Sequence, residues 1–96
     1  MEADHTSSYV HNIKFTDIIL VYPNPTEGIF TLEGKNIQTI EIFNMNGKSI
    51  IKKQLNWNSG NMLQKINLDL TNQQKGIYFI KILTKNRLKI KKLILM

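Results

Sequence analysis

Short apolar runs separated by turn-forming residues constrain the fold of this chain more than any other feature of its sequence. From Asp17 onward, these runs alternate with clusters of Gly, Pro, Asn and Asp about every 8–12 residues. That spacing is typical of β-sandwiches and β-barrels. The chain also contains 15 Ile and 10 Leu but a single Ala, and β-branched residues favour strands. The sequence therefore predicts an all-β fold, an immunoglobulin-like antiparallel β-sandwich of about seven strands.

Alternation within the runs predicts which side chains face the core. Apolar residues recur two apart with polar residues between them, so that they fall on one face of a strand. Two sets are assigned to the core in this way: Ile66, Leu68 and Leu70 in one run, and Tyr78, Ile80 and Ile82 in another.

Glycine and asparagine mark the expected turns. The strand that begins at Phe30 is expected to end at Gly34. Asn44 to Gly47 separates two further runs and contains an Asn-Gly pair, which tolerates the positive φ of a tight turn. We therefore expect a β-hairpin there, with residues 48–53 as the returning strand.

The last run does not keep a simple period of two. Leu88 and Ile90 are out of phase with Leu93 and Leu95 across Lys91-Lys92. A β-bulge would place all four apolar side chains on one face. In the alternative arrangement the strand is regular, with Leu88, Ile90 and Ile94 inward and the other two covered by neighbouring loops. The sequence leaves these alternatives open.

The length of 96 residues allows one domain. We expect residues 1–16 to form a polar linker or leader and residues 17–96 to form the domain. No apolar run approaches the roughly 20 residues of a membrane-spanning helix, so no membrane insertion is expected. The absence of cysteine excludes a disulfide framework, a thiolate nucleophile and a Cys-ligated zinc site.

The inventory of catalytic groups is sparse. His5 and His11 are the only histidines, both in the polar leader, and no Ser lies in a Gly-x-Ser-x-Gly context. Asp4 and His5 alone are too few ligands for a metal site. The five glycines are isolated, which argues against a phosphate-binding loop. We therefore expect no enzymatic activity, no metal and no cofactor.

Three surface features leave alternatives open. Asn24 lies between two prolines and is expected to hold a turn through local side-chain bonds, although a binding role is the alternative. Trp57 is expected to cover one end of the sandwich, the alternative being a sugar-binding platform. The net charge is +6, and the basic residues of the last two runs either contact an anionic partner or protect exposed edge strands. They are Lys81, Lys85, Arg87, Lys89, Lys91 and Lys92, and without exposed stacking aromatics they predict no specific nucleic-acid binding.

Four stretches of the sequence together resemble one known family, the type A C-terminal sorting domains of cargo proteins of the type IX secretion system of the Bacteroidetes. The resemblance covers about residues 17–96, and the stretches follow in the family's order. They are Tyr22-Pro23-Asn24-Pro25 with Gly28 and Phe30 after them; Ile40 to Lys48, which includes Asn46 and Gly47; Leu70 with Lys75-Gly76-Ile77-Tyr78; and Lys91-Lys92-Leu93-Ile94-Leu95-Met96.

This resemblance implies a secretion signal without enzymatic activity. The cargo protein on its N-terminal side would reach the periplasm, cross the outer membrane through the translocon, and become secreted or bound to the cell surface. A sortase-like cysteine protease commonly removes such a domain, and the cleaved bond is then expected in or before residues 1–16. The alternative is an immunoglobulin-like or carbohydrate-binding accessory module that stays on its enzyme.

Overall fold

A computed structural model describes residues 18–55, 62–85 and 87–96. Within these ranges the chain forms seven strands and no helix, which confirms the predicted all-β fold. The strands are β1 (Leu20–Tyr22), β2 (Ile29–Lys35), β3 (Ile37–Phe43), β4 (Ser49–Gln54), β5 (Leu63–Asp69), β6 (Gly76–Thr84) and β7 (Leu88–Leu95).

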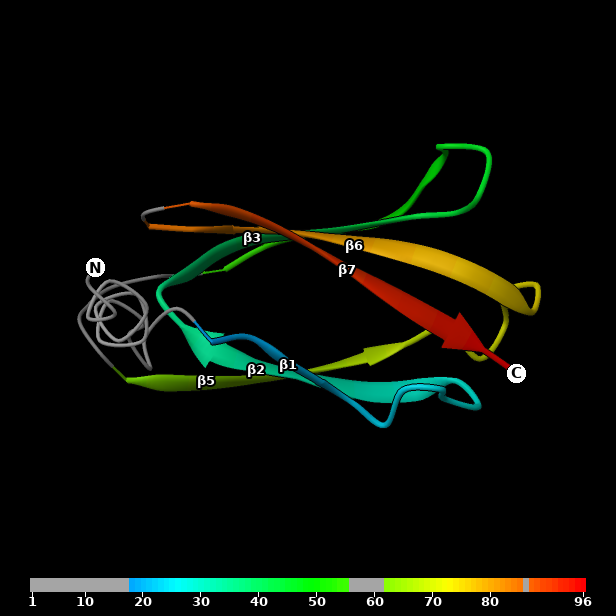
Figure 1. The fold of residues 1–96 in the computed structure, drawn as a ribbon, viewed down its shortest axis with the longest axis horizontal. Helices are drawn as coiled ribbons and strands as arrows, with labels where there is room; N and C mark the ends of the chain where they lie inside the picture. Colours follow the sequence, from blue (N-terminus) through cyan, green and yellow to red (C-terminus); the bar gives the residue numbers. More distant parts are fainter. Residues whose placement is uncertain (1–17, 56–61, 86) are drawn as a thin grey trace, which may run out of the picture.

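The strands form two antiparallel sheets that face each other (Figure 1). One sheet has the order β1-β2-β5 and the other has the order β4-β3-β6-β7. The chain passes from the first sheet to the second between β2 and β3, at Asn36, whose φ is 60°. This two-layer arrangement is consistent with the predicted immunoglobulin-like β-sandwich.

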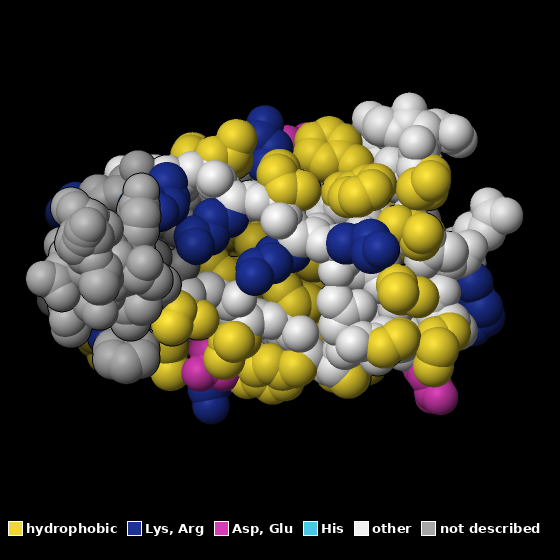
Figure 2. All heavy atoms as spheres, in the orientation of Figure 1, with side chains coloured by type: hydrophobic (Ala, Val, Ile, Leu, Met, Phe, Trp, Pro, Cys, Tyr) yellow, Lys and Arg dark blue, Asp and Glu magenta, His cyan; other side chains and the backbone are white. Residues whose placement is uncertain are grey.

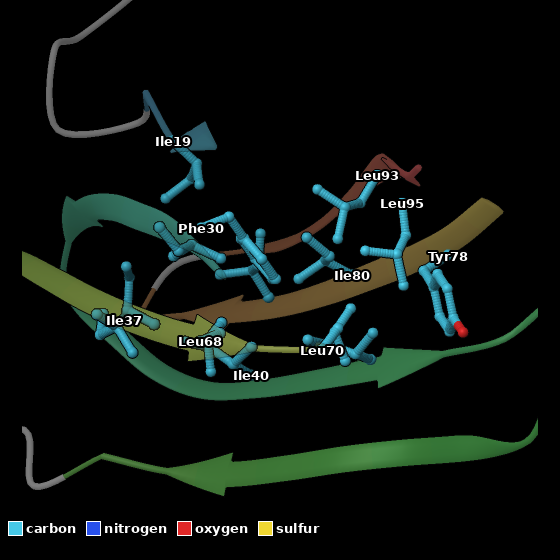
Figure 3. Close-up of a cluster of buried hydrophobic side chains, with 14 residues drawn as sticks. Ile19, Phe30, Ile37, Ile40, Leu68, Leu70, Tyr78, Ile80, Leu93 and Leu95 are labelled. Atoms are coloured by element: carbon cyan, nitrogen blue, oxygen red, sulfur yellow. The ribbon is translucent and has the colours of Figure 1, made fainter. Parts of the chain in front are cut away.

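The core lies between the two sheets and is made of aliphatic and aromatic side chains from both (Figure 3). In β2, β5 and β6 buried residues alternate with more exposed ones, as the pleat of a β-strand requires. Both sets of side chains that the sequence assigned to the core are buried. The complete core cluster is Ile19, Phe30, Leu32, Ile37, Ile40, Ile42, Ile66, Leu68, Leu70, Tyr78, Ile80, Ile82, Leu93 and Leu95.

The predicted hairpin is confirmed between β3 and β4. Gly47 has a φ of 82° and donates its N–H to the carbonyl oxygen of Asn44 at 3.0 Å. The Asn44 side-chain oxygen accepts from the N–H groups of Asn46 at 2.9 Å and Lys48 at 3.0 Å. Local hydrogen bonds from one asparagine therefore hold the turn.

The prediction that Gly34 ends the second strand is wrong. β2 continues through Gly34 to Lys35, and Gly34 pairs with Gln64 of β5. A Cβ atom at Gly34 would lie 2.5 Å from Cδ1 of Ile19 and 3.2 Å from Cδ1 of Ile37. Gly34 is therefore explained by close packing within a strand, and the chain leaves the sheet only after it.

Of the two alternatives for the last strand, the β-bulge is wrong, and the regular strand is confirmed, although its assignment of Leu88, Ile90 and Ile94 to the inner face is wrong. The pairing of β7 with β6 runs without a shift from Leu83↔Leu88 to Gly76↔Leu95, so β7 has no bulge. The inward side chains are nevertheless Leu93 and Leu95, whereas Leu88 is 52% exposed, Ile90 is 57% exposed and Ile94 lies outward at 36%. Directly opposite residues of antiparallel strands share a face, so the inward residues of β6 set the phase of β7.

That phase also turns two lysines toward the inner face of the sheet. Lys89 lies opposite Ile82 and Lys91 lies opposite Ile80, and both lysines are half-buried. A lysine can bury its aliphatic stem and keep its ammonium group in water. Because Lys89 and Lys91 occupy inward positions, the apolar pattern of the sequence conceals the phase of β7.

Candidate functional site

The loop between β1 and β2, residues 23–28, is bonded to the end of β7. The Asn24 side chain donates to the carbonyl oxygen of Lys92 at 2.8 Å and accepts from the N–H of Ile94 at 3.0 Å. The Thr26 backbone donates to the carbonyl of Ile94 and accepts from the N–H of Met96, both at 2.9 Å. Two stretches about 70 residues apart in sequence therefore meet in one structural unit.

The expectation that Asn24 makes only local turn bonds is wrong. Both peptide bonds that precede the prolines, Tyr22-Pro23 and Asn24-Pro25, are cis. In the loop they flank, the Asn24 amide lies against β7 and bonds to it as a neighbouring strand would, with one donor and one acceptor. Asn24 through its side chain and Thr26 through its backbone thus extend the edge of the four-stranded sheet beside β7.

Thr26 and Gly28 fix the other side of this loop. Thr26 is 1% exposed, and its hydroxyl donates to the carbonyl of Ile29 at 2.8 Å and accepts from the N–H of Gly28 at 3.1 Å. Gly28 has a φ of 153°, and a Cβ atom there would lie 2.6 Å from the Thr71 hydroxyl oxygen. The loop therefore has no room for a side chain at Gly28. Sequence reasoning missed Thr26, although it lies between two residues that the motif named.

A short turn after β5 packs against Gly28. The Asp69 carboxylate accepts hydrogen bonds from the Thr71 hydroxyl and from the Thr71 N–H, the latter at 2.8 Å. These two bonds lower the pKa of Asp69 below its ordinary value. The Asp-x-Thr spacing is the available sequence signal for such a turn.

We expect the stability of the domain to depend on pH through Asp69. Its pKa is lower in the folded state than in the unfolded chain, so this contribution is complete above the unfolded pKa of about 3.9 and is lost as the pH falls through the folded pKa. Asp69→Asn should therefore be less stable than the wild type at pH 7 and lose less stability on acidification. Urea unfolding at pH 7 and pH 3 measures this difference, and parallel losses in both proteins would contradict it.

Tyr22 connects the same region to the first sheet. Its hydroxyl donates a hydrogen bond to the Glu33 carboxylate on β2. This bond, together with partial burial and the negative charge of Glu33, raises the pKa of Tyr22 above its ordinary value. Tyr22 therefore remains a neutral hydrogen-bond donor that holds the start of the loop.

The remaining motif residues lie at the same end of the sandwich (Figure 1). Gly76 pairs with Leu95, and the ammonium group of Lys75 donates to the carbonyl oxygen of Met96 at 2.9 Å. Asn46 of the β3–β4 turn lines one shallow hollow together with Gly76 and Tyr78. Tyr78 is buried, and its hydroxyl donates to the carbonyl of Gln74. All four stretches singled out in the sequence thus meet at one end, which we call the motif end.

The residues of the last motif divide between the core and the surface. Leu93 and Leu95 are buried, whereas Lys92 and Met96 are exposed and Ile94 is at the margin. Lys91 is half-buried on the inner side of the strand. The outward residues of the motif end therefore offer a surface of mixed apolar and basic character.

Several sequence expectations concern residues outside the described ranges, namely Asp4, His5, His11 and Trp57. Among residues 18–55, 62–85 and 87–96, no three His, Cys, Asp or Glu residues come close enough to hold a metal ion. The same residues contain no helix long and apolar enough to cross a membrane.

Comparison with known proteins identifies one family. The family model described as "Secretion system C-terminal sorting domain" matches residues 20–96, which is most of the chain. A search of curated proteins finds no match. The matched range begins at β1 and includes all four motif stretches.

Proposed function

The chain belongs to the family of secretion-system C-terminal sorting domains, and we propose that its motif end is the surface that the type IX secretion machinery recognises. The domain is the sorting signal that directs a cargo protein on its N-terminal side through type IX secretion. Its route therefore passes through the periplasm to secretion or to the cell surface. The family is not itself catalytic, and any enzymatic activity of the whole protein would belong to the cargo.

The observation that carries this proposal is the pair of hydrogen bonds between the Asn24 side chain and β7, one donated to the carbonyl oxygen of Lys92 and one accepted from the N–H of Ile94. They join the first motif to the last in one surface, although 68 and 70 positions separate the bonded residues. A translocon that binds this surface reads a folded domain, because the surface does not exist in the unfolded chain. Recognition and folding are thereby coupled.

Within this surface we assign a direct contact to the side chains of Lys91 and Lys92. We expect Lys91→Ala with Lys92→Ala to lower the exported fraction of a reporter that carries an export signal and this domain. The cost in stability should stay below about 1 kcal/mol, since Lys92 is exposed and Lys91 only half-buried. Cell fractionation measures export, and thermal unfolding followed by circular dichroism measures stability.

Lys52→Ala with Lys53→Ala is the matched control, because both lysines are exposed on β4 and carry the same total charge. Export should be unaffected in this control. Equal loss of export in both double variants would instead indicate a requirement for net charge alone, and would contradict a specific role for the motif end.

We further propose that a sortase-like cysteine protease removes the domain after export, at a bond in or before residues 1–16. A folded domain preceded by a polar segment offers an accessible substrate for such cleavage. The intact mass of the secreted reporter tests this step. A mass that retains residues 17–96 would favour an accessory module that stays on its enzyme.

A further inference from the structure

Among residues 18–55, 62–85 and 87–96, only part of the outer edge of β7 is covered. β7 is an edge strand, so its backbone groups alternate between β6 and the outside. The bonds of the 23–28 loop to Lys92, Ile94 and Met96 show that the backbone N–H and C=O groups of the even-numbered residues point away from β6. At the other end of the strand, the carbonyl of Arg87 accepts from the N–H of Thr84 at the end of β6. Odd-numbered residues therefore direct their backbone groups toward β6, which agrees with the same phase.

The first half of this edge has no partner strand among the described residues. The N–H and C=O groups of Leu88 and Ile90, and the N–H of Lys92, point away from β6 in this phase. Leu88 and Ile90 are also more than half exposed. A row of outward donors and acceptors is the feature to which an additional strand binds.

The side chains on both faces of this half-edge specify what kind of strand fits. Lys89 and Lys91 lie on the inner face. The residues opposite them on β6 are Ile82 and Ile80, which have no carboxylate to pair with the lysines. On the outer face lie Leu88 and Ile90, continuous with Leu83, which is 41% exposed. In Figure 2 dark blue side chains cross the view along the line that β7 takes in Figure 1, with yellow apolar side chains beside them.

We propose that residues 88–92 form a docking edge for an extended acidic segment of a partner protein, which adds to the four-stranded sheet beside β7. Acidic residues of that segment lie opposite Lys89 and Lys91 on the inner face, and apolar residues lie beside Leu88 and Ile90 on the outer face. Opposite charges stabilise directly opposite cross-strand pairs, and like charges destabilise them.

Charge also argues against a second copy of this chain as the occupant. Two β7 edges side by side would bring Lys89, Lys91 and Lys92 of one copy against the same lysines of the other. Lysines at an exposed edge discourage pairing between identical strands in this way. The same lysines attract an acidic strand, so one feature both prevents self-association and selects the partner. This docking edge depends on the geometry of β7 and does not depend on the sorting function.

Synthetic peptides test the proposal directly on the chain of residues 1–96. The probe is a short peptide that alternates Glu and Val, and its control alternates Lys and Val. Two further probes are N-methylated versions of the Glu peptide. One carries N-methyl groups along one backbone edge of the extended peptide, and the other carries them along the opposite edge. We expect the Glu peptide to bind, the Lys peptide not to bind, and only one N-methylated peptide to lose affinity, by about tenfold or more. NMR amide shifts measure affinity and locate the bound peptide.

Two variants at one position separate backbone pairing from side-chain contact. Ile90→Pro removes an outward N–H, which no β6 bond requires, and edge strands tolerate proline in that orientation. Ile90→Ala keeps the N–H and shortens the side chain. We expect the Pro variant to lose binding of the Glu peptide and the Ala variant to retain most of it. Lys89→Glu with Lys91→Glu should exchange the preference of the domain for the two peptides.

Several outcomes would overturn the proposal. Equal binding of both N-methylated peptides would show that charge alone attracts them, without strand addition. Amide shifts on β1, β4 or β5 in place of β7 would place the site elsewhere. Dimers that form with rising concentration and disappear in Ile90→Pro would identify a second copy as the occupant. If Ile90→Pro does not fold, the N-methylated peptides still decide the question on the wild-type chain.

Discussion

Deletion of residues 91–96 is expected to unfold the domain and to retain its cargo in the periplasm. The deletion removes Leu93 and Leu95 from the core, and burial of each such side chain contributes roughly 1.5–3 kcal/mol. It also removes the backbone partners of β6 from Gly76 to Ile80 and every hydrogen bond that holds Asn24 and Thr26 to β7. A small domain has a total stability of only about 5–15 kcal/mol, so these losses together are decisive.

Circular dichroism of the truncated chain measures the loss of folding, and fractionation of the reporter fusion measures the loss of export. Lys91→Ala with Lys92→Ala is the informative comparison, because it leaves Leu93 and Leu95 in the core. A truncated fusion exported as efficiently as the intact one would remove the last strand from the sorting signal. A truncated domain that stays folded but is not exported would place recognition in these residues independently of folding.

The parts of the fold that depend on local pattern were predictable from the sequence. Ile66, Leu68 and Leu70 alternate with polar residues over a full strand, so only one face of that strand can be buried. Gly47 specifies its turn because glycine accepts the φ of 82° without strain, and the Asn44 side chain holds the turn by local hydrogen bonds. The family resemblance also lies in local stretches, so the sorting function is predictable without knowledge of tertiary contacts.

The parts that depend on tertiary contacts were not predictable from local pattern. The phase of β7 is set by its pairing with β6, and the half-buried stems of Lys89 and Lys91 contradict the usual assignment of lysine to the surface. Gly34 resembles a strand terminator, but it lies within β2, where a Cβ atom would crowd Cδ1 of Ile19 at 2.5 Å. Asn24 bonds to residues 68 and 70 positions away, a relation that no local pattern encodes.

The motif end itself is assembled from such long-range contacts. Each motif is a turn or a strand end that many β-proteins contain, and in this chain these elements are joined in space. The hydrogen bonds of Asn24 and Thr26 connect the 23–28 loop to the end of β7. Gly28 connects the same loop to the end of β5, since the Leu70 N–H donates to the Gly28 carbonyl at 2.9 Å.

Gly28→Ala is therefore expected to destabilise the domain far more than Gly76→Ala. Both glycines have positive φ, 153° and 145°, so a side chain at either position costs backbone strain of roughly 1–3 kcal/mol. At Gly76 a Cβ atom meets nothing within 4 Å, whereas at Gly28 it meets the Thr71 hydroxyl oxygen at 2.6 Å and the Thr71 Cα at 3.1 Å. Overpacking of this kind adds about 1–3 kcal/mol, which urea unfolding of the two variants measures.

The same crowding makes Gly28 and Thr71 energetically coupled. Thr71→Ala removes the hydroxyl that a Cβ atom at Gly28 would strike, but it also removes one of the two hydrogen bonds to Asp69. Thr71→Ala alone should therefore destabilise the domain, while Gly28→Ala should cost less in the Thr71→Ala background than in the wild type. A double-mutant cycle isolates this difference. Strict additivity of the two substitutions, or equal losses for Gly28→Ala and Gly76→Ala, would mean that backbone strain alone explains the glycine and that the β5 turn does not hold the 23–28 loop in place.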